Sequence, residues 1–210
     1  TGSTSSNLGF SATYDNQGNF YAGGLVSLNL GGAYPVTPGA FQVTYGGGTN
    51  TSGIQYACDM GIMKFSADGT NRIWATYLGG ADNDQPHSMV VDSAENLVIA
   101  GRTYSNNFPV KAGCYDTSHN GNADIVVVKL NSTATALIGS TYIGGSADDA
   151  VNFSGQEFVT GNLKYNYGDD ARSEVILDNQ ANIYVTASTS SANFPVTASA
   201  TQSTLKGTQD

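Results

Sequence analysis

The stretch DSAENLVIAG at residues 92–101 decides the fold, because its pattern also stands at residues 15–23 (DNQGNFYAG) and 178–185 (DNQANIYV). In each copy an aspartate and an asparagine enclose a short polar turn, and an apolar run typical of a β-strand follows. A pattern that returns at long intervals along a chain indicates a repeat architecture. We therefore expect a fold built from several copies of one β unit.

Further phrases recur in the same order around this stretch. A proline-containing loop stands at residues 34–41 (YPVTPGAF), 108–115 (FPVKAGCY) and 194–197 (FPVT). An apolar run led by aspartate, followed by a T-Y-x-G-G ending, stands at residues 59–65 and 76–80, and again at 124–130 and 141–145. A short apolar stretch precedes the turn at residues 84–92 and 170–178. Proline excludes a central strand from the loop, whereas the other phrases predict strands.

One unit thus contains four strands, a to d, arranged as two hairpins. Four antiparallel strands per repeat are the plan of a β-propeller blade. We expect an all-β fold, a β-propeller of four-stranded antiparallel blades, of which residues 1–210 hold about two and a half. The expected parts are blade 1 at about 7–80, blade 2 at about 81–145, a d-to-a insertion at 146–169 and the start of blade 3 at about 170–210.

Asp210 is expected to open strand c of the third blade. Because stacked repeats bury their faces only against neighbours, such a piece should expose an unpaired strand edge. The remaining blades of the same chain are therefore expected partners.

These phrases resemble the bacterial β-propeller repeat family known as SBBP, whose hallmarks are a D-x-x-G-N-x-Y-V-x-G strand, an F-P-V-T-x-G-A-F loop, a D-x-F-V-x-K-L strand and a T-Y-L-G-G ending. Glu95 and Ala181 stand where the family has a turn glycine, and the third loop departs from the pattern at residues 198–201. The resemblance implies a large secreted or cell-surface protein of a Gram-negative bacterium, and it implies no catalytic residues.

The composition agrees with an extracellular β protein. Charged residues make up 12% of the chain and glycine accounts for 26 residues. The net charge is −9 and the few basic residues are scattered, so nucleic acid is a poor candidate partner. No apolar run reaches the roughly 20 residues of a membrane helix, and no membrane insertion is expected.

The long connections of this topology leave the sheets at one face, which we call the long-loop face. They are residues 26–58 and 102–123 between strands b and c, and 146–169 between d and a. Aromatic side chains on such loops suit stacking on sugars or gripping a protein. The alternative, equally open, is that they plug their own loops. The candidate ligand-binding residues are Tyr45, Tyr56, Phe153, Phe158, Tyr165 and Tyr167.

Acidic residues near the blade junctions could hold calcium, and the weak candidates are Asp84 and Asp170. No D-x-D-x-D-G loop with a closing glutamate supports such a site. The favoured alternative is that these side chains cap backbone donors in tight turns, so no cofactor is expected. Lys64 and Lys129 also recur at matching places, and we expect them to be structural partners of these junction carboxylates.

The two cysteines, Cys58 and Cys114, lie on the long-loop face of neighbouring blades and have no metal-ligand spacing. They form either one inter-blade disulfide or two separate thiols, and both alternatives remain open.

Catalysis has few candidate groups. His87 and His119 are the only histidines, and neither has a nucleophile or metal spacing; we expect His87 to be exposed or bonded in a turn. We expect a non-catalytic extracellular binding or scaffold module, acting in adhesion or in protein or glycan recognition. The alternative is a carbohydrate-active propeller enzyme whose catalytic groups lie outside this segment.

Overall fold

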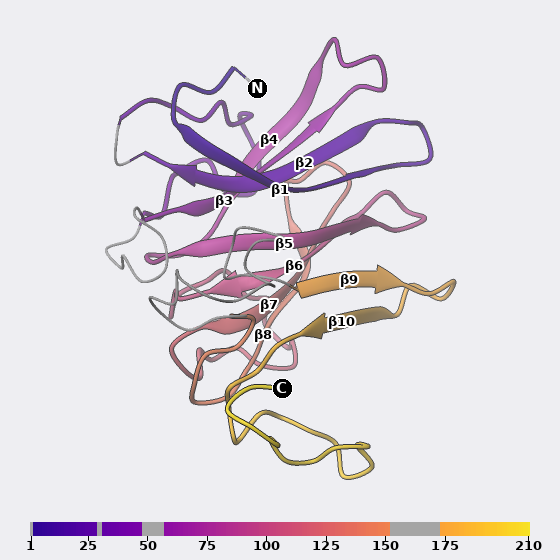
Figure 1. The fold of residues 1–210 in the computed structure, drawn as a ribbon. Helices are drawn as coiled ribbons and strands as arrows, with labels where there is room; N and C mark the ends of the chain where they lie inside the picture. The colour runs from indigo at the N-terminus through magenta and orange to yellow at the C-terminus, as the bar shows by residue number, and fades with distance from the viewer. Residues whose placement is uncertain (1, 29–30, 48–56, 152–172) are drawn as a thin grey trace, which may run out of the picture.

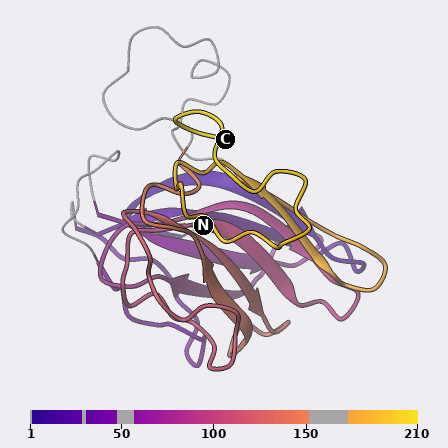
Figure 2. The same cartoon turned by 90° about the horizontal axis from the view of Figure 1, so that it is seen from below.

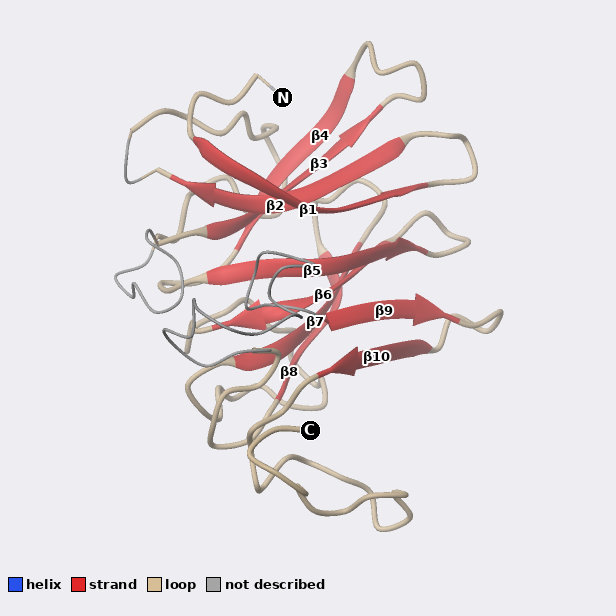
Figure 3. Cartoon of the chain, in the orientation of Figure 1, coloured by secondary structure: helices blue, strands red, loops and turns tan. Residues whose placement is uncertain are grey.

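The computed structural model describes residues 2–28, 31–47, 57–151 and 173–210. These residues form two four-stranded antiparallel sheets and one two-stranded antiparallel sheet, joined by loops (Figure 3). The all-β prediction is confirmed. Within the described residues no helix is long and apolar enough to cross a membrane.

Each sheet is built from strands that follow one another along the chain. The first sheet contains β1 (Ser6–Tyr14), β2 (Phe20–Ser27), β3 (Asp59–Phe65) and β4 (Arg72–Leu78). The second sheet contains β5 (Asp84–Val91), β6 (Leu97–Thr103), β7 (Asp124–Leu130) and β8 (Leu137–Ile143). The third sheet contains β9 (Ser173–Leu177) and β10 (Ile183–Ala187).

The three sheets form an open stack with the first and third at opposite ends (Figure 1). Seen from below, the third sheet and the C-terminal loop lie in front of the other two sheets (Figure 2). Because a sheet inside a stack is covered on both faces, its strands are continuous apolar runs, as in β7. One core cluster joins the first two sheets through residues such as Ile62 and Ile99, and another joins the second and third through Val127 and Val175.

The recurring aspartate holds the a-to-b turn of every sheet. Asp92 Oδ1 accepts the amides of Ala94 at 2.8 Å and Asn96 at 2.9 Å, and Asn96 Nδ2 donates to Asp92 Oδ2 at 3.0 Å. Asp15 and Asp178 accept the corresponding bonds. The aspartate thus fixes the turn through its own side chain.

The turn keeps one backbone conformation even where glycine is replaced. Gly18, Glu95 and Ala181 have φ of 79°, 63° and 62°. Glu95 and Ala181 therefore depart from the glycine of the family pattern without changing the turn, and each holds a left-handed conformation that disfavours a Cβ.

The recurring lysines pair with these turn aspartates. Lys64 Nζ lies 2.8 Å from Asp15 Oδ2, and Lys129 Nζ lies 2.7 Å from Asp92 Oδ2. A carboxylate does pair with each lysine, but the expected junction carboxylates were wrong, because the partner belongs to the a-to-b turn of the adjacent strands. The lysine is in reach because strand c pairs with strand b in the same register in both sheets.

The long b-to-c loop covers the outer edge of strand d. In the first sheet Thr37 N donates to Ala75 O at 2.9 Å and Tyr77 N donates to Gln42 O at 3.0 Å. In the second, Tyr142 N makes the same bond, at 3.1 Å, to Asp116 O. An exposed strand edge is a site of unwanted pairing, and this loop satisfies its backbone groups. Part of the long b-to-c loop therefore serves to cover the outer edge of strand d.

Asp210 occupies the expected start of strand c. Its backbone exchanges two hydrogen bonds with Thr189, at 2.8 and 2.9 Å, and Asp124 is paired with Thr103 in the same way at the start of β7. Within the described residues β10 pairs only with β9, which leaves the other edge of β10 open.

Candidate functional site

Tyr45, the candidate ligand-binding residue that the structure describes, folds back onto its own sheet. Its hydroxyl donates to Ala57 O at 2.7 Å, and its ring centroid lies 5.7 Å from that of Tyr77. The ring of Tyr34 also packs on Tyr77, with the two ring centroids 5.2 Å apart. Burial raises the pKa of Tyr45 to about 12. This placement favours the interpretation in which loop aromatics form the loop's own core.

The other predicted ligand-binding aromatics lie outside the described residues: Tyr56, Phe153, Phe158, Tyr165 and Tyr167. The weak calcium candidate Asp170 also lies outside them.

Asp84, the second weak calcium candidate, is the centre of a buried polar cluster between the first and second sheets. Its side chain is fully buried, and Oδ2 accepts Gly80 N at 2.7 Å and the Ser105 hydroxyl at 2.9 Å. Oδ1 accepts the hydroxyl of Thr103. The residues that follow strand d of the first sheet are thereby attached to strands a and b of the second. We call Gly80, Asp84, Thr103, Ser105 and Asn107 the first junction cluster.

Asn107 and Ser105 also hold the chain just after Gly80. Asn107 Oδ1 accepts Ala81 N and Ser105 Oγ accepts Asp82 N, both at 2.8 Å. A Cβ on Gly80 would lie 2.5 Å from both Asn107 Oδ1 and Ser105 Cβ, closer than real contacts allow. The second glycine of the T-Y-x-G-G ending is therefore required by the next sheet and not by a turn of its own.

The same cluster recurs between the second and third sheets, centred on Asp149. Asp149 Oδ2 accepts Gly145 N at 2.7 Å and the Ser191 hydroxyl at 2.9 Å, and Oδ1 accepts the Thr189 hydroxyl. Asn193 Oδ1 accepts Ser146 N at 2.9 Å. We call Gly145, Asp149, Thr189, Ser191 and Asn193 the second junction cluster.

The hydrogen bonds correct the predicted equivalence of Asp84 with Asp170. Asp149 makes the bonds of Asp84, whereas β5 begins at Asp84 itself and β9 begins only at Ser173. The prediction was wrong because Asp170 was chosen by its distance in the sequence from the turn at Asp178. The insertion separates strand a of the third sheet from its junction aspartate, so that distance differs from the one in the second sheet. Asp84 binds amide and hydroxyl donors, which agrees with the capping interpretation.

A pattern in the sequence could have located both clusters. T-x-S-x-N-F-P stands at residues 103–109 and again at 189–195, directly before the loop proline. Its polar residues are those that hold the preceding Gly-Gly in both clusters. Sequence reasoning used only the F-P part of this pattern.

A second buried carboxylate faces each junction aspartate. A Cβ on Gly79 would lie 2.7 Å from Asp84 Oδ2 and 2.9 Å from Asp59 Oδ1, so both carboxylates approach this backbone. Asp59 is fully buried; Oδ2 accepts Gly46 N at 2.7 Å, while Oδ1 has no hydrogen-bond partner. Burial raises the pKa of Asp59 to about 7 and that of Asp84 well above its ordinary value.

Asp124 takes the place of Asp59 at the second junction. It is fully buried, its Oδ2 accepts Asn120 N at 2.7 Å, and its Oδ1 has no hydrogen-bond partner. Burial raises its pKa to about 6, and Asp149 is among the charges that raise it. Two facing buried carboxylates favour the uptake of a proton, because both cannot be ionised cheaply in a medium of low polarity.

The described residues contain no group of three or more His, Cys, Asp or Glu side chains that could hold a metal ion. The donors around Asp84 are amides and hydroxyls that point at the carboxylate.

The cysteines are two separate thiols, so the disulfide alternative is not the one the structure adopts. Cys58 is buried with its Sγ 3.8 Å from Asp84 O, and Cys114 places its Sγ 3.2 Å from Asp116 O. Burial raises the pKa of Cys58 to about 12, which makes this thiol a poor nucleophile.

His87 was predicted to be exposed or bonded in a turn, and the structure corrects this. It lies in β5, is buried, and its Nδ1 is 2.9 Å from Ser173 Oγ of β9. Burial, with the nearby charge of Arg102, lowers its pKa well below the ordinary value. The prediction failed because the third sheet covers this side of β5, which the local sequence does not reveal.

Residues 73–109 match the family described as the beta-propeller repeat, SBBP. Over these residues the chain is similar to that repeat. The matched residues run from β4 through the first junction cluster, β5 and β6 to the loop proline, so they contain one complete attachment between two sheets. The four-stranded antiparallel sheets agree with the blades of a beta-propeller repeat. No curated protein matches the chain.

Proposed function

We propose that this chain is a non-catalytic binding or scaffold module of a larger secreted or cell-surface protein of a Gram-negative bacterium. Its sheets act as consecutive blades of a β-propeller. The long-loop face recognises a surface protein or a glycan, in adhesion or a related contact. The net charge of −9 argues against a nucleic acid as the partner.

One observation carries the proposal: the sheets repeat the same structural bonds, whereas the insertion between Asp149 and β9 has no counterpart at the first junction. Asp84 and Asp149 perform the same task in the two junction clusters. The insertion then separates Asp149 from β9 with no counterpart at the first junction. A rigid scaffold that varies only in its loops is the usual arrangement of a binding module.

The polar groups of the described sheets support a structural role over a catalytic one. The turn aspartates bind amides and lysines, and the junction aspartates bind glycine amides and hydroxyls. His87, at the sheet interface, is buried and bonded to Ser173. Each of these groups is occupied in holding strands or sheets together.

The experiment is a binding assay of the chain on a glycan array and on whole cells. The test variant combines Tyr165→Ala and Tyr167→Ala, in the part of the long-loop face that differs between the junctions. The matched control is Tyr14→Ala, an aromatic that is 75% exposed beside the a-to-b turn at the opposite end of the sheet.

Binding by the parent and by Tyr14→Ala, with loss in the double variant that still gives a folded circular dichroism spectrum, supports recognition through the long-loop face. Equal binding by all three proteins rules out these aromatics. Turnover of a bound glycan by the parent would overturn the non-catalytic assignment.

A further inference from the structure

Each junction contains one buried carboxylate oxygen that accepts no hydrogen bond within the described residues. These oxygens are Asp59 Oδ1 and Asp124 Oδ1, and both side chains are fully buried. At the first junction Asp59 Oδ1 and Asp84 Oδ2 approach the backbone of Gly79 together, and at the second Asp124 and Asp149 approach Gly144 in the same way. Because the same arrangement occurs twice, the oxygen without a donor is a feature of the junction and requires a physical explanation.

The donors around Asp84 identify it as the ionised member of the first pair. Thr103 Oγ1 accepts Ser105 N at 2.9 Å, and Ser105 Oγ accepts Asp82 N at 2.8 Å. Each hydroxyl therefore already accepts an amide and gives its own hydrogen to Asp84. With the amide of Gly80, three donors point at this carboxylate, which favours its charged form.

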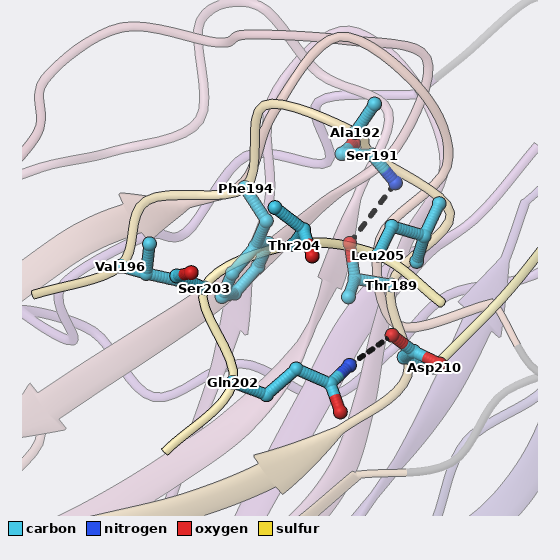
Figure 4. A pocket seen from close by; sticks show the side chains of 10 residues that line it. All are labelled: Thr189, Ser191, Ala192, Phe194, Val196, Gln202, Ser203, Thr204, Leu205 and Asp210. Carbon is cyan, nitrogen blue, oxygen red and sulfur yellow. Dashed lines mark hydrogen bonds between the residues drawn. The ribbon is translucent and has the colours of Figure 1, made fainter. Parts of the chain in front are cut away.

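The same donor pattern surrounds Asp149 at the second junction. Figure 4 shows the hydroxyl of Thr189 accepting the amide of Ser191, at 3.0 Å. Ser191 Oγ accepts Ala147 N at 2.9 Å, so both hydroxyl hydrogens are again directed at the carboxylate. Gly145 N supplies the third donor. Asp149 is therefore the ionised member of the second pair.

Asp59 lacks the donors that a buried charge requires. Its Oδ2 accepts Gly46 N at 2.7 Å, but its Oδ1 accepts nothing from the described residues. A buried ionised oxygen without a donor is costly, whereas a protonated oxygen is itself a donor. A carboxylate has about four lone-pair sites, so Asp84 can accept one hydrogen bond beyond the three that it receives.

We propose that Asp59 carries a proton on Oδ1 and donates it to the carboxylate of Asp84, and that this proton couples the junction to the b-to-c loop. Asp124 and Asp149 form the same pair at the second junction. Loss of the proton leaves two negative charges facing each other in a buried site. The carboxylate that then moves is Asp59, because it is held by fewer hydrogen bonds than Asp84.

The b-to-c loop contacts the pair closely enough to respond to this movement. Gly46 N is bonded to Asp59 Oδ2, and a Cβ on Gly46 would overlap the carbonyl oxygen of Gly80. In the second loop Asn120 N is bonded to Asp124 Oδ2 at 2.7 Å. A shift of Asp59 therefore removes the acceptor of the amide that follows Tyr45.

The other titratable groups at the first junction keep their charge near neutral pH. Burial raises the pKa of Cys58 and that of Tyr45 to about 12, and it also raises the pKa of Tyr77. The guanidinium of Arg102 acts on the Cys58 thiol and stays charged throughout. A step in this range therefore reports the carboxylate pair.

The second junction has further groups that act on its pair. The charges of His119 and Asp116 both act on Asp124, and burial raises the pKa of Tyr142 to about 12. Because histidine is the side chain that changes charge near neutral pH, the first junction gives the cleaner test.

The test measures amide exchange by NMR in the chain at about pH 5.5 and about pH 8.5, relative to an unstructured peptide at each pH. We expect protection of the Gly46 amide to fall about tenfold at the higher pH in the parent. Asp59→Asn should keep it, because the amide retains an oxygen for Gly46 and donates its NH₂ to Asp84. Asp84→Asn is the matched reverse variant, and its NH₂ meets the donors of Gly80, Thr103 and Ser105, so protection should be reduced at both pH values.

Equal protection of Gly46 at both pH values in the parent overturns the proposal. Protection kept at the higher pH by Asp84→Asn and lost by Asp59→Asn also overturns it, by placing the proton on Asp84. Protection restored at the higher pH by calcium chloride and removed by EDTA would assign the pair to a cation instead.

A second measurement decides the matter if Asp84→Asn fails to fold. In the parent, the carboxyl ¹³C signal of Asp59 should change between the two pH values while that of Asp84 stays constant, and the reverse result overturns the proposal. The inference is independent of ligand recognition by the long-loop face, because neither measurement involves a ligand of that face.

Discussion

The first and second junctions use the same chemistry in different surroundings. At the first, the chain passes from Gly80 to Asp84 and directly into β5. At the second, Asp149 makes the same bonds to Gly145 and the following strand begins only at Ser173. The position of the next sheet therefore depends on the junction cluster and not on a short connection between strands.

This difference explains how the fold tolerates an insertion. The bonds from Gly145, Thr189 and Ser191 to Asp149 connect the end of β8 to the end of β10, whatever lies between Asp149 and β9. Loop length adds only a slowly rising entropy of closure, which a buried set of hydrogen bonds can offset.

Removal of the junction aspartates should have the largest effect on stability and should distinguish the two junctions. Asp84→Ala leaves Gly80 N and the Thr103 and Ser105 hydroxyls without their acceptor inside the stack, and we expect the free energy of unfolding to fall by about 4 kcal/mol. Asp149→Ala should instead detach mainly the third sheet. Urea unfolding measures the free energy of unfolding of each variant, and limited proteolysis detects detachment of the third sheet.

The outcome that would contradict the comparison is an equal global loss in both variants, with no early cleavage in residues 173–210 for Asp149→Ala. The conservative controls are Asp84→Asn and Asp149→Asn, which keep one acceptor oxygen and should lose less.

The pH dependence distinguishes the two facing carboxylate pairs. Burial raises the pKa of Asp59 from 3.8 to about 7, so the folded protein binds more protons than the unfolded chain between these values. Stability from this group is fully present below about pH 4 and is lost as the pH rises to about 7, a fall on the order of 4 kcal/mol. Asp124, raised to about 6, should contribute a smaller fall that ends earlier.

Unfolding curves between pH 4 and 8 check this, with Asp59→Asn and Asp124→Asn as variants that flatten the profile. Below pH 4 the sign reverses. Burial pushes the pKa of Asp15 upward, but hydrogen bonds from Lys64 and Asn19 outweigh it and hold the value at about 2, so its contribution is lost in acid. A parent profile that rises from pH 4 to 8 would contradict the carboxylate pairing.

The two lysine pairs offer a smaller contrast. The side chain of Lys64 is 6% exposed and that of Lys129 is 20% exposed. We expect Lys64→Ala to lower the free energy of unfolding by about 2 kcal/mol, because Asp15 keeps its amide donors, and Lys129→Ala by about 1 kcal/mol. Thermal unfolding measures the difference. A larger loss for Lys129→Ala would contradict the claim that the more buried pair contributes more stability.

The smallest expected effect sharpens the comparison of the turns. Ala181 holds φ of 62° where Gly18 holds 79°. Ala181→Gly should stabilise the third sheet by about 1 kcal/mol, since glycine adopts this conformation without the Cβ penalty. Gly18→Ala should destabilise the first sheet by a similar amount. Amide exchange in β9 and β2 reports the two effects, and no change in either would mean that the turns relax to another conformation.

Much of the fold followed from the sequence because the repeat encodes it locally. The turn aspartates and the start of strand c at Asp210 act within one sheet, and the sequence predicts both. The lysines also act within one sheet, but their partners are the turn aspartates and not the predicted junction carboxylates. The candidate site was less predictable. Tyr45 was equally suited to a ligand or to its own loop, and only its contact with Tyr77 distinguished the two.

What the sequence by itself determined was the order of strands, the turns and the repeated unit, because these depend on residues close together in the chain. Only the tertiary structure decided that Asp149 is the partner of Gly145, that His87 is covered by β9, and that Cys58 and Cys114 stay apart. The physical reason is that each of these depends on how one sheet packs against the next. An insertion can move residues any distance along the chain while leaving that packing unchanged.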